Sequence, residues 1–490
     1  MANRECCKII TPNLERRSII TEQALTQQAA EFAAGLDYED IPKEALRIAR
    51  RCIIDGLGVM LAGSEQPVID VAERYARLNG GNGHSRVVGD ASLHLPAHMA
   101  AFWNGLAGHA MDWDDTQLAE GPGRPYGLLT HPTVPPLSAA LVISDMVGGV
   151  NGKDFLTAFV AGFEVECKIA EAINPDHYNL GFHTSGTIGT FGSAVTAAKL
   201  LGFDASGIAR AMGGAASMAA GIRANFGTMG KPMHVARSSE NGVTSALLVQ
   251  EGFTFNEESL DGKWGYLEVA GRGGEPELVL GRFGNPFSIV KPGISIKPYP
   301  SGVLTHPSMD AVKFLMEENR LSPDEIEKVT LFAANNILHP IRFRIANSEL
   351  EGKFCMAFLL SAMILRGKAG KAEFTDEFVL SETVQAMQMR VETAFDPEID
   401  AMGYDRIRSR VEVTTKDGRK FDRWADENYR GSPHNPLSDD ELECKFKDCA
   451  EGLLDDCRVQ SLFDMVWKLE AQKDVTGIYE LLDWRSERTD

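Results

Sequence analysis

The first three fifths of the chain carry apolar residues at helical spacing, with little of the alternation that strands show. In DIPKEALRIARRCIIDGLGVMLAG, Ile53, Ile54, Leu57 and Leu61 recur on one face of a helix, with Asp40 as the expected N-cap. GKDFLTAFVAGFEVECKIAEAI repeats this amphipathic pattern, and GTFGSAVTAAKLLG and IARAMGGAASMAAGI are rich in small residues. Small side chains let helices approach closely, so these segments are predicted to be central.

The pattern changes near residue 291. VKPGISIKPYPSGVLTHP is rich in proline and glycine, EIEKVTLFAA alternates like a strand, and RSRVEVTTKDGRKFDRW predicts a hairpin that turns at Asp417-Gly418. LSDDELECKFKDCAEG then predicts a helix that begins with a capping box of Ser438 and Glu441. We therefore predict a mainly α protein, in which a large all-helical domain (21–292 and 429–490) receives an inserted, smaller α+β lid domain (293–428). Residues 1–20 are expected to form an arm.

Composition and charge narrow the function classes. The formal net charge is −20, with acidic residues spread along the chain, which argues against nucleic acid and anionic membrane surfaces as partners. The charged N-terminus lacks the apolar run of a signal peptide, and no uncharged stretch predicts a membrane span. The eight cysteines include no CxxC motif, which is typical of a reducing, cytoplasmic location and gives no metal-site signal.

The segment HAMDWDDTQ places three carboxylates directly after an apolar stretch that predicts a buried helix. Buried carboxylates are costly unless they are paired, so this segment is either a water-exposed helix end or a site. If the helix continues, Asp112 and Thr116 share one of its faces. Divalent metal binding is a further alternative, although no complete EF-hand loop is present.

Four other segments carry residues suited to chemistry. His131 lies in a proline-rich loop, LLTHPTVPP, and His183 precedes an apolar helix in NLGFHTSGTIGTFGSA, where backbone N–H groups are available to an anion. GKPMHVARSSENG and IKPYPSGVLTHP supply positive charge that the chain otherwise lacks. In these two segments the candidates are Lys231, His234, Lys297, Tyr299 and His306. Each residue taken alone is also compatible with a purely structural role.

Together, these segments and ARRCIIDGLGVMLAG, THP and VEVTTKDGRKF resemble the MmgE/PrpD family, whose members include 2-methylcitrate dehydratase, cis-aconitate decarboxylase and iminodisuccinate epimerase. The resemblance implies the same two-domain fold, a homodimer, and a reaction without metal or organic cofactor. It also implies a cleft of Asp112, Thr116, His131, His183, Lys231 and Lys297, in which Asp112 is buried because it faces cations. Asp114 and Asp115 are then expected to bind nearby backbone or to face water.

Two features depart from the decarboxylase pattern. The stretch between Thr116 and His131 is longer than in typical decarboxylases, and its role is left open; the tyrosine of the decarboxylase lid is replaced by Leu338. The substrate is therefore expected to be a small anionic di- or tricarboxylate without closer definition. Thr116, His234, Tyr299 and His306 are the predicted substrate-binding residues.

The chemistry shared by this family is proton transfer at a carbon beside a carboxylate. Such a reaction needs cations at the carboxylate oxygens, for which Lys231 and Lys297 are suited, and a base, for which His131 or His183 is suited. Asp112 would orient a histidine or keep a lysine charged. We expect a lyase, either a dehydratase or a decarboxylase. The alternatives are an epimerase, which reprotonates the opposite face, and a non-catalytic helical scaffold.

Overall fold

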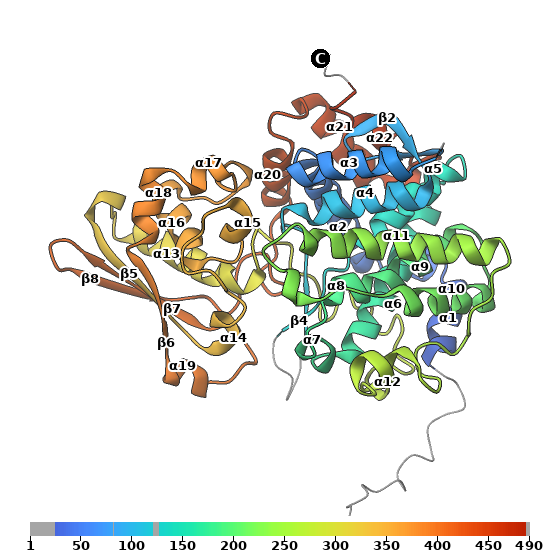
Figure 1. Cartoon of the computed structure of the whole chain (residues 1–490), viewed down its shortest axis with the longest axis horizontal. Coiled ribbons are helices and arrows are strands. Elements are labelled where there is room, and N and C mark those ends of the chain that lie inside the picture. Colours follow the sequence, from blue (N-terminus) through green and yellow to red (C-terminus); the bar gives the residue numbers. More distant parts are fainter. Residues whose placement is uncertain (1–24, 82, 121–126, 487–490) are drawn as a thin grey trace, which may run out of the picture.

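A computed structural model describes residues 25–81, 83–120 and 127–486 of the chain. It has two parts (Figure 1): a larger one made almost entirely of helices, and a smaller one built on a four-stranded sheet. The predicted fold class, mainly helical with a smaller α+β lid, is confirmed. The predicted arm, residues 1–20, lies outside the described residues.

Small residues at helix contacts organise the larger part. Gly63 in α2 (Lys43–Gly63) lies so close to α4 (Ala97–Ala110) that a β-carbon on it would be 1.8 Å from the carbonyl oxygen of Ala107. The other elements before the junction are α1 (Leu25–Gly35), α3 (Pro67–Asn79), β1 (Ser85–Val87), β2 (Asp90–Leu95), β3 (Gln117–Leu118), β4 (Leu128–Thr130), α5 (Val134–Met146), α6 (Gly152–Ile173), α7 (Asp176–Asn179), α8 (Thr184–Thr187), α9 (Gly189–Leu200), α10 (Ala205–Met218), α11 (Gly230–Gln250) and α12 (Tyr266–Gly271).

The lid is built on a mixed sheet with the strand order β6–β5–β7–β8. The predicted strand is β5 (Ile326–Ala333), which runs parallel to β6 (Val391–Phe395) and antiparallel to β7 (Ser409–Thr415). The predicted hairpin joins β7 to β8 (Lys420–Trp424), and both predictions are confirmed. The helices of the lid are α13 (His306–Glu318), α14 (Asn335–Leu338), α15 (Glu349–Gly352), α16 (Met356–Arg366), α17 (Asp376–Val379), α18 (Glu382–Gln388) and α19 (Pro397–Ala401).

The C-terminal helices lie with the larger part rather than with the lid (Figure 1). These are α20 (Asp439–Ala450), α21 (Asp456–Trp467) and α22 (Ile478–Leu481). α20 begins with the predicted capping box and packs on α2, where Lys445 forms an ion pair of 2.5 Å with Asp55. The exact domain limits, at 292 and 428, stay a prediction.

One local prediction is wrong, and the condition attached to another is not met. Asp40 does not cap α2, because it belongs to a separate 3-10 turn (Tyr38–Asp40) and Pro42 occupies the N-cap position. The helix before Asp112 does not continue, because α4 ends at Ala110 and Asp112 adopts a left-handed backbone with φ of 52°. Asp112 and Thr116 therefore do not share a helix face.

The described residues contain no single helix that is both long and apolar enough to cross a membrane. Taken together, α2 and α3 meet the length and composition criterion, but they bend by 82° relative to each other. All six cysteines in the described part of the chain are free.

Candidate active site

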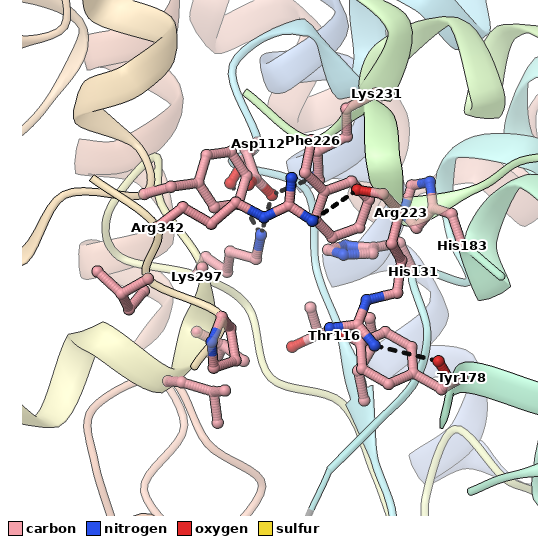
Figure 2. Close-up of a pocket in the computed structure, with 17 residues that line it drawn as sticks. Asp112, Thr116, His131, Tyr178, His183, Arg223, Phe226, Lys231, Lys297 and Arg342 are labelled. Atoms are coloured by element: carbon pink, nitrogen blue, oxygen red, sulfur yellow. Dashed lines mark hydrogen bonds and ion pairs between the residues drawn. The ribbon is translucent and has the colours of Figure 1, made fainter. Parts of the chain in front are cut away.

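A pocket with about 660 Å³ of space between atoms lies where the lid meets the larger part (Figure 2). Residues of the larger part and the junction form one wall, and lid residues form the other. The residues that line it are Asp112, Thr116, Leu128, His131, Tyr178, His183, Arg223, Phe226, Lys231, Lys297, Gly302, Val303, Leu304, Pro340, Ile341, Arg342 and Phe354. All six residues that the family resemblance implied are among them.

The turn that follows α4 is held by ammonium groups from three distant segments. Lys353 of the lid donates to the carbonyl oxygen of Ala110 (2.9 Å), Lys297 of the junction to that of Asp112 (2.8 Å), and Lys445 of α20 to that of Trp113 (2.8 Å). The end of a helix carries partial negative charge, which these cations offset. The apolar helix can therefore end in buried carboxylates without exposing them to water.

Asp112 accepts two ammonium groups on one oxygen. Its Oδ1 lies 2.7 Å from Nζ of Lys297 and 3.0 Å from Nζ of Lys231, and all three side chains are buried. Burial opposes ionisation of Asp112, but the attraction of Lys231 and Lys297 outweighs it, so the pKa of Asp112 lies well below its usual range. Its second oxygen is buried without a hydrogen-bond partner. A left-handed backbone at a non-glycine residue is uncommon and marks a position that its surroundings determine strongly.

Histidine side chains form a cluster beside these charges. The ring centroids of His109 and His131 lie 4.9 Å apart, and those of His131 and His183 6.4 Å apart. Burial, the largest effect in each case, lowers the pKa of His131 and lowers that of His183 well below its ordinary value. Both rings are therefore neutral near pH 7, which a base requires. Nε2 of His183 is buried and has no hydrogen-bond partner.

Thr116 is joined to the junction by backbone pairing. Thr116 and Ser295 exchange two hydrogen bonds, of 2.9 and 2.8 Å, and Lys297 follows two residues later. This pairing brings two residues that are 179 positions apart in sequence to one wall of the pocket. The hydroxyl of Thr116 is buried without a partner, so it is available to a ligand.

Three of the predicted substrate-binding residues do not line the pocket. His234 lies behind His183, with 3.1 Å between their Nδ1 atoms. Tyr299 donates to Asp310 (2.6 Å) and accepts from Arg430 (2.9 Å), and Nε2 of His306 lies 3.2 Å from the carbonyl oxygen of Ser301. These contacts place the three side chains in the protein interior. Leu338 is not a lining residue either.

The expectation for Asp114 and Asp115 is also wrong. Both are buried, and both bind side chains rather than water or backbone. Asp114 contacts His109 and His131, and Oδ2 of Asp115 accepts from the hydroxyl of Thr133 (2.6 Å). Burial, as the main cause, raises the pKa of Asp115 to about 7.

The sequence reasoning missed two guanidinium groups. The side chain of Arg342, on the lid, donates to the backbone carbonyl oxygen of Arg223, on the larger part, at 3.0 Å, and this contact joins the two sides of the pocket (Figure 2). The guanidinium of Arg223 also lies 3.8 Å from the ring centroid of Tyr178. Neither arginine belongs to a motif that stands out, and only their meeting in space relates them to the site.

Two groups of side chains in the described part of the chain have spacing that could hold a metal ion. Their donor atoms lie within 4.8 Å of one another: His109, His131 and His183 in one group, and His109, Asp112 and Asp114 in the other. However, Nζ of Lys231 already lies 2.8 Å from Nε2 of His109 and pairs with Asp112. A metal ion would have to displace this ammonium group, so the donor set fits the lysine better.

The buried histidines predict acid sensitivity. Burial lowers the pKa of His109 to about 3 and those of His177 and His234 to about 4. Below about pH 6.5 these histidines are protonated in the unfolded chain but stay neutral in the folded protein. Each of them therefore lowers the free energy of unfolding by roughly 1.4 kcal/mol for every pH unit of acidification. Burial also lowers the pKa values of His183 and His306 well below the ordinary value, so five histidines with large shifts act in this direction. The raised pKa values of Asp115 and Glu166 act in the opposite direction, and other buried carboxyls have smaller upward shifts: Asp55, Glu164, Glu240, Asp310 and Asp448. The five histidines outnumber the two carboxyls with large shifts. The urea midpoint should fall steadily from pH 7 to pH 5, and a flat profile would contradict this expectation.

Comparison with known proteins identifies the family of the chain. The model of the MmgE/PrpD N-terminal domain matches residues 27–279, and that of the C-terminal domain matches residues 299–470. Human cis-aconitate decarboxylase is 28% identical over 469 residues, which cover 94% of this chain and 95% of that protein. Cis-aconitate decarboxylase of Aspergillus terreus strain NIH 2624 / FGSC A1156 is 25% identical over 487 residues, with 94% and 96% covered. The chain therefore belongs to the MmgE/PrpD family, as an enzyme of the lyase class.

Proposed function

We propose that this enzyme decarboxylates a small unsaturated tricarboxylate, with cis-aconitate as the first candidate. The observation that carries the proposal is the set of cations around one pocket: Lys231 and Lys297 at its base, and Arg223 and Arg342 at the line where the lid meets the larger part. The relatives named as cis-aconitate decarboxylases support this choice of substrate.

The charge of the pocket suits a polyanion. The residues that line the pocket include four cations and one carboxylate, Asp112, so their net charge is +3. Including the buried carboxylate of Asp114 lowers this net charge to +2. The chain as a whole has a formal charge of −20, so the electrostatic potential in the pocket has the opposite sign to that of the protein as a whole. A neutral or cationic substrate would gain nothing from this arrangement, whereas a tricarboxylate would neutralise it.

The same cations can stabilise the charge that develops during decarboxylation. In an unsaturated tricarboxylate, the bond to a carboxylate on the carbon next to the double bond breaks, and CO2 leaves. The electron pair moves through the double bond, and negative charge reaches the carboxylate oxygens at the far end. One proton then adds beside that carboxylate, which gives an unsaturated dicarboxylate. Ammonium groups near those oxygens stabilise the transition state more than the ground state.

We assign the proton transfer to His131. Its Nδ1 lies 2.8 Å from the carbonyl oxygen of Asp115, so Nδ1 carries a hydrogen and Nε2 carries the lone pair. Since His131 lines the pocket, a proton accepted at Nε2 can be passed to the reacting carbon. His183, with its unpartnered Nε2, is the second candidate for this role.

The proposal is tested with a panel of tricarboxylates in D2O, monitored for CO2 and by NMR of the products. We expect cis-aconitate to release one CO2 for each dicarboxylate formed, with one deuterium at the protonated carbon. Loss of water from a hydroxytricarboxylate without CO2 would identify a dehydratase instead. Deuterium in recovered substrate, with no elimination product, would identify an epimerase. The Lys291→Ala variant, which changes an exposed lysine in the junction, serves as the control.

A further inference from the structure

Asp114 lies outside the pocket but contacts two of the imidazoles beside it. Both of its carboxylate oxygens are 2.8 Å from Nδ1 of His109, and Oδ2 is 3.3 Å from Nδ1 of His131. The side chains of Asp114 and His109 are at most 1% exposed. Because Asp114 itself does not line the pocket, its contact with the site runs through these two rings.

The contacts determine which nitrogen of each ring carries the hydrogen. An ionised carboxylate and a carbonyl oxygen only accept hydrogen bonds, so Nδ1 of His109 and Nδ1 of His131 must both donate. In a neutral ring the other nitrogen then has a free lone pair. Nε2 of His109 accepts a hydrogen bond from Nζ of Lys231 at 2.8 Å, and Nε2 of His131 is left for the pocket.

His109 thereby directs the ammonium group of Lys231. One of the three hydrogens of Lys231 points to Nε2 of His109, and a second points to Oδ1 of Asp112 at 3.0 Å. Phe226 and Phe354 face the same ammonium group, with ring centroids 5.5 and 5.7 Å away. The third hydrogen is thus available to an anion in the pocket, in a direction that the other two contacts set.

We propose that Asp114 is a positioning residue for the reaction: it holds His109 in the Nδ1–H form and, through His109, aims the ammonium group of Lys231 at the substrate. His131 has a second acceptor for its Nδ1–H, the carbonyl oxygen of Asp115 at 2.8 Å, and does not depend on Asp114 alone. This inference rests on the proposed function for its effect on turnover. Its structural half, the form of the His109 ring, does not depend on which substrate is used.

Replacing Asp114 with asparagine tests the idea with little change in shape. Both carboxylate oxygens lie 2.8 Å from Nδ1 of His109, so the NH2 group of asparagine faces this nitrogen in either orientation of the amide. An NH2 group only donates, so it favours the form of His109 that carries its hydrogen on Nε2. An N–H group then opposes the ammonium of Lys231. His131 keeps the carbonyl oxygen of Asp115 as its acceptor and should not change.

We expect Asp114→Asn to lower kcat by about 10- to 100-fold, as loss of a group that orients an essential ligand typically does. The matched control is Asp115→Asn, which changes the neighbouring buried carboxyl, whose side chain touches neither ring. A kcat for Asp114→Asn within about twofold of this control would overturn the proposal. Urea midpoints of both variants show whether folding is preserved.

A spectroscopic measurement separates this inference from the proposed function. In the free enzyme, nitrogen-15 NMR of labelled histidine should show Nδ1–H for both rings, with signals assigned by their loss in the His109→Gln and His131→Gln variants. His109 should change to Nε2–H in Asp114→Asn, whereas His131 should keep Nδ1–H. Retention of Nδ1–H by His109 would overturn the inference, even if decarboxylation is observed. The expected change would support it, even if no tricarboxylate reacts.

A second pair of variants covers the case in which Asp114→Asn does not fold. Glutamine at position 109 can place its amide oxygen near the position of Nε2 and still accept from Lys231, whereas leucine cannot. We expect His109→Gln to retain at least about tenfold more activity than His109→Leu, which loses this acceptor. Equal activity of the two variants would show that the contact with Lys231 has no positioning role.

Discussion

Replacing Lys297 with alanine is expected to lower kcat by about 10²- to 10³-fold, the usual cost of removing one group that stabilises developing charge (about 2.7–4 kcal/mol). Lys297 lines the pocket and pairs with Asp112 at 2.7 Å, so its loss removes a cation from the pocket and leaves Asp112 with Lys231 alone. Steady-state kinetics with the substrate identified in the panel measure the effect, and circular dichroism checks the fold.

Two further variants make this test specific. Lys297→Arg should restore activity only partly, because a planar guanidinium cannot reproduce the point charge of an ammonium group. Lys291→Ala removes an exposed lysine six residues away and should leave kcat unchanged. If Lys297→Ala retains more than about a tenth of the wild-type kcat, Lys297 does not stabilise the developing charge.

Replacing Lys445 with methionine is expected to lower the free energy of unfolding by about 3–5 kcal/mol, the typical result of breaking a buried ion pair from one side. Lys445 pairs with Asp55 at 2.5 Å, and both side chains are at most 4% exposed. Its loss also leaves the carbonyl oxygen of Trp113 without the ammonium group that it accepts. Urea unfolding followed by fluorescence measures the change.

The same substitution two residues later provides the control. Lys447 also lies on α20 and pairs with Glu443 at 2.8 Å, but its side chain is 52% exposed. Surface pairs contribute little, so Lys447→Met should change the free energy of unfolding by less than about 0.5 kcal/mol. Comparable losses for the two variants would mean that burial of the Lys445 pair has no special effect. The double variant Asp55→Asn/Lys445→Met should recover part of the loss, because no unpaired buried charge remains.

Much of the fold could be predicted from the sequence because it depends on short-range pattern. The spacing of apolar residues in α2 and α6, the alternation in β5, and the Asp417-Gly418 turn between β7 and β8 each lie within one continuous segment. The sequence pattern is less informative where two neighbouring residues are both suited to the same structural position. Asp40 and Pro42 are both suited to the start of α2, and the choice depends on how the preceding turn packs.

The site could be predicted only in part. Asp112, His131, Lys231 and Lys297 belong to motifs that stand out, and the structure brings them to one pocket. Tyr299 and His306 lie in equally suggestive segments, but their side chains face the interior. A motif indicates that a residue type is suited to chemistry, whereas the direction of its side chain depends on the backbone of the folded chain.

The sequence by itself determined the helical class, the inserted lid, the family and two of the four pocket cations, Lys231 and Lys297. Only the tertiary structure decided that Arg342 meets Arg223 across the pocket, that Asp114 binds two histidines, and that lysines from three segments hold the turn after α4. The physical reason is range: propensity and periodicity act over a few residues. A contact between side chains that no local pattern pairs exists only after the chain around them has packed.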